Sequence, residues 1–300
     1  MKIAIAGGTG FVGQHLTKHL IDRGDEVFIL TRHPNKHRNK QKITYIGWLN
    51  ENLNPIAQLP PLDAIINLAG ESLFGYWTKS KKDRIYQSRI KATYAIIDMI
   101  KEMKYKPAVL INASAVGYFG TSLTETFTES RKESGNDFLA EVTEAWEKTA
   151  LEANTYGVRT VIARFGVILG TEGALPLMTM PFKWYVGGGK IGSGEQWVSW
   201  IHITDVIGMI LFSLDHPTID QAFHMTAPSP IKNSKMAEVI AQTLHKPNWL
   251  PVPRVAIKAL LGEMSILVES GQKVLPEKAI KSGYSFQYSH IEKALEDLLK

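Results

Sequence analysis

The sequence predicts an α/β protein, a doubly wound parallel sheet with a smaller C-terminal α+β lobe. Strand-like and helix-like segments alternate from residue 2 to about 170, which is typical of parallel sheets. A glycine-rich turn joins the first strand to the first helix. The 300 residues suffice for a sheet domain over 1–165 and a lobe over 166–300, with residues around 197–225 expected to return to the sheet.

Composition excludes several classes of protein. Hydrophobic residues make up 44% and charged residues 21% of the chain, as in globular proteins rather than disordered or fibrous ones. The absence of cysteine excludes disulfide scaffolds, thiolate metal sites and cysteine nucleophiles, and no histidine cluster indicates a metal site. Because the chain shows neither an apolar leader nor an apolar run of membrane-span length, we expect a cytoplasmic protein without membrane partners.

The first elements form a strand–helix–strand unit. Lys2–Ala6 is predicted as a buried strand because it is nearly all apolar. Val12, Leu16 and Leu20 recur every four residues and form one face of a helix. Glu26–Thr31 is the next apolar segment and is predicted as the second strand.

The alternation continues through the first half of the chain. The pattern predicts strands at 62–70, 108–120 and 158–170, and helices at 81–103 and 138–153. Ligands of such sheets bind beyond the carboxyl ends of the strands, where Gly70, Ser114 and Arg164 fall. In the lobe, helices are predicted at 238–246 and 290–299, and the glycine-rich stretch 185–200 is predicted to be a mobile flap or a surface loop.

The turn "GGTGFVG" predicts a dinucleotide site. Gly7 permits a backbone turn, Gly10 lets a pyrophosphate approach the main chain, and Gly13 lets helix and strand pack closely. The free N–H groups of the following helix and its dipole favour an anion. The predicted cofactor contacts in this turn are Gly7, Thr9, Gly10, Phe11, Val12 and Gly13.

The end of the second strand favours NADP(H) over NAD(H). An NAD site commonly places a carboxylate there to bind the ribose 2′-hydroxyl, whereas this chain has Thr31, Arg32 and His33. A guanidinium pairs well with a 2′-phosphate, although Arg32 also fits an exposed strand end. The basic stretch 32–42 is either a solvated loop or a phosphate-facing one; it has no aromatic residue to stack on bases, so no nucleic-acid partner is expected.

Several motifs resemble one superfamily in content and order. They are "GGTGFVG", "INLAGES", "SRIKAT", "NASAVGYFG", "ARFGVILG" and "WIHITDV". Together they resemble the extended short-chain dehydrogenases/reductases, the sugar-nucleotide epimerase and dehydratase group. The tail that begins "LLGEMSILVESGQKVLPEKAIKSGY" looks like the C-terminal extension of an atypical, epimerase-like branch that includes the human short-chain dehydrogenase family 39U.

The resemblance implies a Rossmann-fold NADP(H) binder whose lobe closes over a substrate. It also implies a catalytic tyrosine followed four residues later by a lysine, and none of the ten tyrosines here has that partner. Where the pair would lie, this chain has Leu139 and Thr143, and neither transfers a proton at neutral pH.

The remaining candidates for catalysis are Ser114 and Tyr118. Ser114 matches the superfamily's catalytic serine, although it also fits a strand-capping hydroxyl, and Tyr118 matches the tyrosine of the following turn, although it also fits simple packing. Arg89 stands where the superfamily has an asparagine, and it is expected to bind cofactor phosphates or supply positive charge. Predicted cofactor contacts outside the turn are Thr31, Arg32, Leu68, Ala69, Gly70, Arg89 and Ile168.

Two functions remain open. One is an NADP(H)-dependent, epimerase-like oxidoreductase that acts on a small carbonyl, hydroxyl or nucleotide-sugar-like substrate, and it fits the complete cofactor motif and lobe. The other is a non-catalytic NADP(H)-binding sensor or assembly protein, and it fits the missing tyrosine–lysine pair. A homodimer is compatible with both. His202 is expected to be structural, at a turn whose helix cap is Thr204 or Asp205.

Overall fold

The computed structural model describes residues 1–50, 52–183 and 188–300. Its centre is a seven-stranded parallel sheet in the order β11-β7-β5-β4-β1-β2-β3. The chain winds outward in both directions from the β1–β4 pair, so the prediction of a doubly wound parallel sheet is confirmed. The strands are β1 Lys2–Ala6, β2 Glu26–Thr31, β3 Ile43–Gly47, β4 Ala64–Asn67, β5 Val109–Ala115, β7 Arg159–Phe165 and β11 Gln221–Met225.

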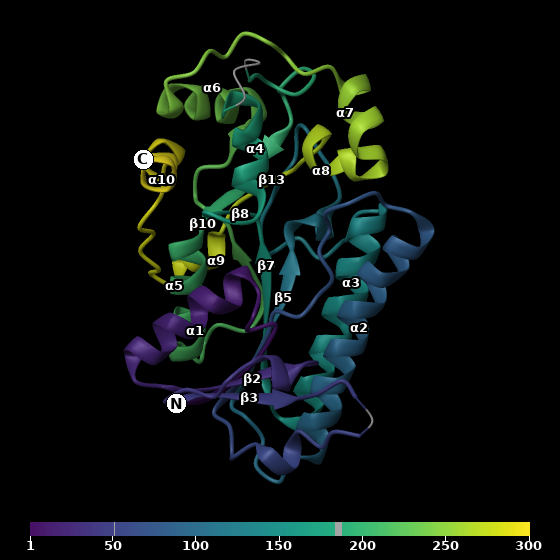
Figure 1. The fold of residues 1–300 in the computed structure, drawn as a ribbon, viewed down its shortest axis with the longest axis vertical. Helices are drawn as coiled ribbons and strands as arrows, with labels where there is room; N and C mark the ends of the chain where they lie inside the picture. Colours follow the sequence, from purple (N-terminus) through teal and green to yellow (C-terminus); the bar gives the residue numbers. More distant parts are fainter. Residues whose placement is uncertain (51, 184–187) are drawn as a thin grey trace.

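Two pairs of helices cover the two faces of the sheet (Figure 1). On one face α1 Phe11–Arg23 and α5 Ile203–Asp215 pack over Ile3 and Ile5. On the other, α2 Lys79–Glu102 and α3 Phe138–Leu151 lie side by side. Because successive strand residues point to opposite faces, each central strand contributes to both hydrophobic layers.

The lobe covers the carboxyl ends of the strands (Figure 1). It is built on its own core, with Trp200 fully buried among residues of α4, α6 and α10. Its helices are α4 Ala174–Lys183, α6 Asn233–Leu244, α7 Arg254–Leu261, α8 Ile266–Glu269, α9 Glu277–Lys281 and α10 Ile291–Leu299. Outside the central sheet there are three two-stranded pairs among the described residues, namely β8 Val167–Leu169 with β10 Trp200–His202, β9 Trp197–Val198 with β12 Ile231–Lys232, and β6 Thr126–Phe127 with β13 Lys273–Val274. The last of them joins the lobe to the first half of the chain.

Three details differ from the sequence-based expectations. The basic stretch leads into β3, a strand that we did not predict. The strand expected at 158–170 is divided into β7 and β8 at Gly166, where a Cβ atom would lie 2.3 Å from the Ser199 carbonyl oxygen. The cap of α5 is His202 itself, whose Nδ1 accepts the N–H of Thr204 at 3.1 Å, and not Thr204 or Asp205.

The glycine-rich stretch predicted as a flap is described in part. Residues 185–187, including Gly187, lie outside the described residues. Beyond them, Gly188 and Ile191 form parallel bridges with Asn248 and Val252. This part of the stretch is therefore paired with the segment that leads into α7.

Candidate functional site

The turn between β1 and α1 is sterically closed to side chains at two glycines. Gly7 has φ +78°, and a Cβ atom on it would lie 2.6 Å from the Leu68 carbonyl oxygen. A Cβ atom on Gly13 would lie 2.4 Å from the Gly7 carbonyl oxygen. At Gly10 the nearest atom would be 3.4 Å away, so this glycine leaves open space beside the backbone. The turn therefore offers a bare main-chain surface at the edge of the sheet where ligands bind.

The first turn of α1 fits a phosphate group. Gly10 is the N-cap residue, and no side chain among the described residues caps the helix there. The helix also carries no acidic residue in its first turn that would repel an anion. Unpaired N–H groups and the positive end of the helix dipole are the elements that bind pyrophosphates in dinucleotide sites.

The segment that follows β8 packs against the first residue of α1. A Cβ atom on Gly170, directly after β8, would lie 2.4 Å from the ring of Phe11. Ile168 lies in β8, opposite Ile201 of β10, and is half-buried against the main core. The predicted contacts Phe11 and Ile168 thus come from neighbouring parts of the structure, although they are far apart in sequence.

The end of β2 presents the residues expected to select the cofactor. Thr31 is buried and its Oγ1 accepts the N–H of His33 at 3.3 Å. Arg32 is exposed. A hydrogen bond from Lys81 holds the pKa of Glu71 below its ordinary range, and the positive charges of Arg84 and Arg32 act in the same direction. Arg32 therefore lies near the loop that follows β4.

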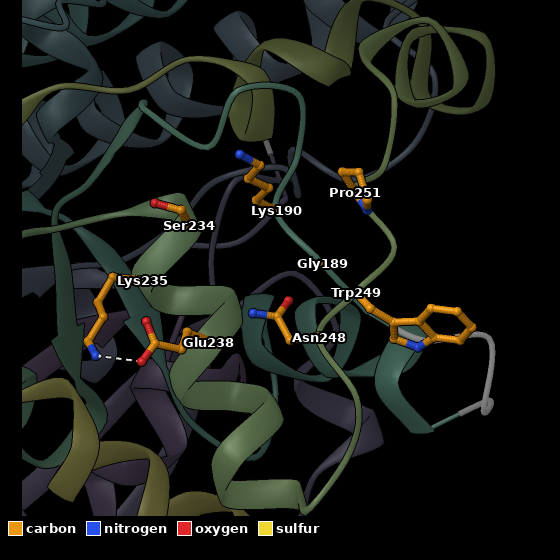
Figure 2. Close-up of a pocket in the computed structure, with 8 residues that line it drawn as sticks. All are labelled: Gly189, Lys190, Ser234, Lys235, Glu238, Asn248, Trp249 and Pro251. Atoms are coloured by element: carbon orange, nitrogen blue, oxygen red, sulfur yellow. Dashed lines mark hydrogen bonds and ion pairs between the residues drawn. The ribbon is translucent and has the colours of Figure 1, made fainter.

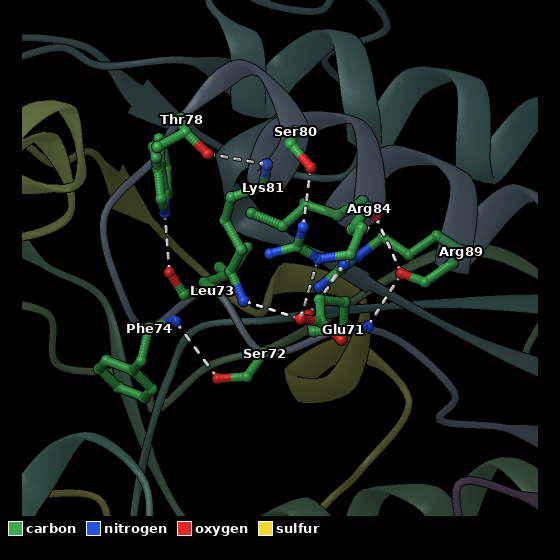
Figure 3. A network of polar contacts seen from close by, with 12 residues as sticks. Glu71, Ser72, Leu73, Phe74, Thr78, Ser80, Lys81, Arg84 and Arg89 are labelled. Carbon is green, nitrogen blue, oxygen red and sulfur yellow. Dashed lines mark hydrogen bonds and ion pairs between the residues drawn. The ribbon is translucent and has the colours of Figure 1, made fainter.

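That loop carries the predicted contacts Leu68, Ala69 and Gly70, and it is fastened by charged residues (Figure 3). Lys81 Nζ donates to Glu71 Oε1 at 2.9 Å, and Arg84 Nε lies 3.8 Å from the same oxygen. These residues come from the first turns of α2. The loop is thus held to α2 by charge as well as by its backbone.

Arg89 lies against this loop. A Cβ atom on Gly70 would be 3.3 Å from Arg89 Cζ, and Arg89 Nη1 donates to the carbonyl oxygens of Glu71 at 3.1 Å and Ile85 at 2.9 Å. Burial lowers the pKa of Arg89 to about 10, so it stays positively charged at neutral pH. The side chain places a fixed cation beside the carboxyl end of β4.

At the end of β5, Ser114 belongs to a buried network. Its hydroxyl donates to Glu147 Oε1 at 2.5 Å. Glu147 also accepts Nε and Nη2 of Arg164, both at 2.7 Å. All three residues are less than 9% exposed, so this is an ion pair removed from water. The sequence places Ser114 and Arg164 at strand ends but gives no reason to select Glu147.

Tyr118 is joined to the same network. The Arg164 guanidinium stacks on its ring at 3.6 Å, and its hydroxyl donates to the Lys132 carbonyl oxygen at 2.6 Å. Burial raises the pKa of Tyr118 above its ordinary value. The structure therefore brings Ser114 and Tyr118 together, with both hydroxyl protons already engaged.

The positions of the missing tyrosine and lysine carry no ionisable group. Thr143 Oγ1 donates to the Leu139 carbonyl oxygen at 2.8 Å, within its own helix. Leu139 is half-buried in an apolar cluster that includes Trp77, Phe138 and, from the lobe, Met264. Leu139, Thr143 and Glu147 follow each other at four-residue spacing on α3, so Glu147 is the first ionisable group on that helix row.

A further pocket on the described surface has fewer features of a binding site than the region around the glycine turn. A shallow pocket of about 290 Å³ lies between α6 and the segments around Gly189 and Trp249 (Figure 2). It contains an exposed ion pair between Lys235 and Glu238 at 3.0 Å. Among the described residues no three metal-ligating side chains gather in one place. Within the same residues, no helix combines the length and the apolar character that a bilayer crossing requires.

Two family models match the chain. The model described as "NAD dependent epimerase/dehydratase family" matches residues 3–225. A second, described as "Domain of unknown function (DUF1731)", matches residues 252–298. The first covers all seven strands of the central sheet, and the second begins shortly before α7 and covers most of α10.

Individual relatives match over the full length of this chain, or nearly so. "Epimerase family protein YfhF" of Bacillus subtilis is 47% identical over 100% of this chain and 98% of that protein. The crystal structure of human epimerase family protein SDR39U1 (isoform 2) with NADPH has a TM-score of 0.87 at 28% identity, over 99% of each chain. A nucleoside-diphosphate sugar epimerase from Corynebacterium glutamicum has a TM-score of 0.80 at 30% identity, over 100% of this chain and 58% of that one.

Proposed function

Because the chain belongs to the NAD dependent epimerase/dehydratase family, we propose that it binds NADP(H) and transfers hydride to or from a small carbonyl, hydroxyl or nucleotide-sugar-like substrate. The observation that carries the cofactor part is the combination of a bare glycine turn with Arg32 at the end of β2. The human relative that shares the fold was solved with NADPH, which supports the same choice.

The residues of the turn and strand ends have distinct parts in this proposal. The N–H groups after Gly10 hold the pyrophosphate, and Arg32 pairs with the 2′-phosphate. Ala69 and Gly70 present little or no side chain to a flat group beside the loop, and Arg89, which packs against Gly70, supplies a fixed positive charge there. NADP(H) supplies the hydride chemistry when it is bound.

The proton must come from a group other than the usual pair. Leu139 and Thr143 cannot provide it. Ser114 and Tyr118 remain the candidates to contact substrate, and Ser114 Oγ, with its proton held by Glu147, is disposed to accept a hydrogen bond rather than to donate one. A substrate hydroxyl fits that arrangement better than a carbonyl.

The cofactor proposal is tested by comparing NADPH and NADH binding. We expect NADPH to bind more tightly by about 1–3 kcal/mol, the scale of a charge-assisted hydrogen bond. Arg32→Ala should remove most of this difference and leave NADH binding unchanged, as measured by calorimetric titration. Arg38→Ala, an exposed arginine of the same basic stretch, is the matched control. Equal affinities for the two cofactors in the unmodified protein would refute NADP(H) preference.

The catalytic proposal is tested with the cofactor loaded. Purified protein with NADPH is offered a panel of carbonyl compounds and nucleotide sugars, and oxidation is followed by nicotinamide absorbance. Conversion of one substrate class supports an enzyme. Tight NADPH binding without conversion of any of them favours the second function.

A non-catalytic NADP(H)-binding sensor or assembly protein is that second function. It is favoured by one specific observation, that both candidate hydroxyls already donate to acceptors within the protein. A cytoplasmic location and a homodimer accompany both proposals, and sedimentation of the purified chain tests the dimer.

A further inference from the structure

The cavity at the far edge of the sheet from β3 lies away from the proposed cofactor contacts, although Tyr118, a candidate substrate contact, and its neighbours Glu147 and Arg164 line one side of it. Its volume is about 590 Å³. It opens between β7, β11, the end of α3, α9 and the loop 129–132. The glycine turn leaves β1, and β4 and β5 separate that strand from β7, so cavity and turn lie over different parts of the sheet.

The floor of the cavity is apolar. Ile162 of β7 and Ala222 of β11 are paired directly across the two strands, and Leu151 at the end of α3 completes the surface. These side chains can make van der Waals contacts with a bound molecule but cannot form hydrogen bonds with it.

The rim of the cavity carries more positive than negative charge. Its cations are Arg131, Lys132, Arg164, Lys278 and Lys281, and its carboxylates are Glu129, Glu147 and Glu277. Glu147 pairs with Arg164 and also accepts the Ser114 hydroxyl, and Glu277 pairs with Lys281 at 2.7 Å. Two carboxylates outside the lining act on the rim as well: Glu133 pairs with Arg131 at 2.7 Å, and Asp220 Oδ1 lies 3.9 Å from Lys278 Nζ. Lys132 has no side-chain partner within the described part of the chain.

The cations of the rim act on one another. Burial lowers the pKa of Lys278, and the charges of Lys132 and Arg164 lower it further, against the opposite effect of Asp220 and Glu129. Burial also raises the pKa of Glu129, which weakens its ability to offset the lysines. A bound anion would relieve this repulsion.

Two further features are typical of binding sites. Gln221, which lines the cavity, has φ +50°, a conformation that residues other than glycine rarely adopt and that is enriched at functional positions. Arg164 Nη1 is buried and has no hydrogen-bond partner among the described residues. The inner end of the cavity therefore holds an arginine whose donors are not all used.

We propose that this cavity binds a small organic anion, a molecule that carries a phosphate or carboxylate group on an apolar body. The anionic group lies among Lys132, Lys278 and Lys281, and the apolar body lies on Ile162 and Ala222. The proposal does not depend on cofactor binding, because the cavity shares no residue with the glycine turn or the end of β2, but it shares Tyr118 with the proposed substrate contacts.

Calorimetric titration of the full chain tests the proposal with three probes, phenyl phosphate, benzoate and inorganic phosphate. Each is added with NADP⁺ saturating, so that the glycine turn and Arg32 are not available to the anion. If the cofactor does not bind, the Arg32→Ala variant without NADP⁺ removes Arg32 as a competing site, and the lysine variants below show whether the remaining binding is at the cavity. We expect saturable binding of phenyl phosphate or benzoate that is tighter than that of inorganic phosphate, and the preferred probe distinguishes phosphate from carboxylate.

Variants locate the bound anion. Lys132→Gln and Lys281→Gln each remove the positive charge of an exposed lysine at the rim, and each should weaken binding about tenfold. Lys235→Gln, on α6 and outside the cavity, should leave binding unchanged. Ala222→Leu fills the floor and should weaken phenyl phosphate more than inorganic phosphate. The proposal is overturned if none of the probes binds saturably, or if binding is the same in both lysine variants as in the unmodified chain.

Discussion

Two regions at the carboxyl ends of the same sheet are built on opposite principles. At the glycine turn, backbone atoms form the site, and Gly7 and Gly13 are packed so closely that a Cβ atom would meet main-chain oxygens. At the end of β5, side chains form the site, and Glu147 and Arg164 are charged and buried together. In the proposed function the turn binds anions through main-chain N–H groups, whereas the β5 end has already paired its charges internally.

Because the two regions are built differently, substitutions in them should change different properties of the protein. Changes at the turn should affect ligand binding through steric obstruction. Changes at the β5 end should affect stability through uncompensated charge. The variants below, each with a control, separate effects on binding from effects on stability.

The largest effect is expected at Glu147. Glu147→Gln leaves the Arg164 guanidinium, which is 4% exposed, without its carboxylate, and breaking a buried pair typically costs about 3–5 kcal/mol. The free energy of unfolding in urea measures this loss. Glu144→Gln, on the same helix but exposed, is the control and should change stability by less than about 0.5 kcal/mol. Equal losses of unfolding free energy in the two variants would show that the buried pair stabilises the protein no more than an exposed carboxylate does.

The turn should show a smaller effect on stability and a larger one on binding. In Gly13→Ala the added Cβ would lie 2.4 Å from the Gly7 oxygen and 2.6 Å from Gly8 Cα, so main chain must move. We expect a loss of about 1–3 kcal/mol in unfolding free energy, as for other overpacked positions, and loss of NADPH binding. Gly10→Ala, with its nearest contact at 3.4 Å, should retain stability but still weaken NADPH. If Gly10→Ala binds NADPH normally, the pyrophosphate does not approach there.

The residues of the turn could be predicted from the sequence, whereas the network at the end of β5 could not, and the reason is physical. The turn was predicted residue by residue, because each glycine has a local steric cause and the strand and helix patterns on either side fix its place. Glu147 was not predicted, because its partners Ser114 and Arg164 lie 33 and 17 residues away in the sequence. A single glutamate in a charged helix gives no sign of such distant contacts. Only the register that sets Ser114 opposite Arg164 brings the three together.

The same distinction applies to the fold. The central helices and strands were predicted from periodicity, whereas β3 was missed because it lies at the edge of the sheet and follows a polar stretch. His202 was expected to be structural, but its role as helix cap depends on a ring nitrogen that usual capping preferences do not include.

The third effect concerns pH at His224, which lies opposite Arg164 on β11. Burial lowers the pKa of His224 from its ordinary 6.5 to about 3. Between these values the unfolded chain binds a proton that the folded chain does not, so the contribution of His224 is fully present above 6.5 and decreases as pH falls. We expect a loss of about 1.4 kcal/mol per pH unit from this group.

Urea unfolding at about pH 7, 6 and 5 measures this slope. His224→Asn should reduce it, whatever the variant does to stability at neutral pH. Glu129→Gln is measured in parallel, because burial raises the pKa of that neighbouring carboxyl and its titration has the opposite sign. An unchanged slope in His224→Asn would show that the histidine is protonated in the folded protein.

The smallest effect on stability is expected at Ser114, and it decides the most about function. Ser114→Ala removes one hydrogen bond but leaves both contacts between Glu147 and Arg164, so no buried charge loses its partner. The cost should be about 1 kcal/mol, the net value of one hydrogen bond.

If Ser114 contacts substrate, Ser114→Ala should strongly slow single-turnover hydride transfer although it lowers the free energy of unfolding only a little. The rate is measured with saturating NADPH and with any substrate that the panel identifies. Leu139→Ala is the control, because it removes half-buried apolar surface near the same site and should lower stability while the rate per folded, NADPH-loaded molecule is retained. An unaltered rate in Ser114→Ala would assign the serine to the buried network alone. The β5 end would then be a structural counterpart of the cofactor turn, and the non-catalytic function would account better for both regions.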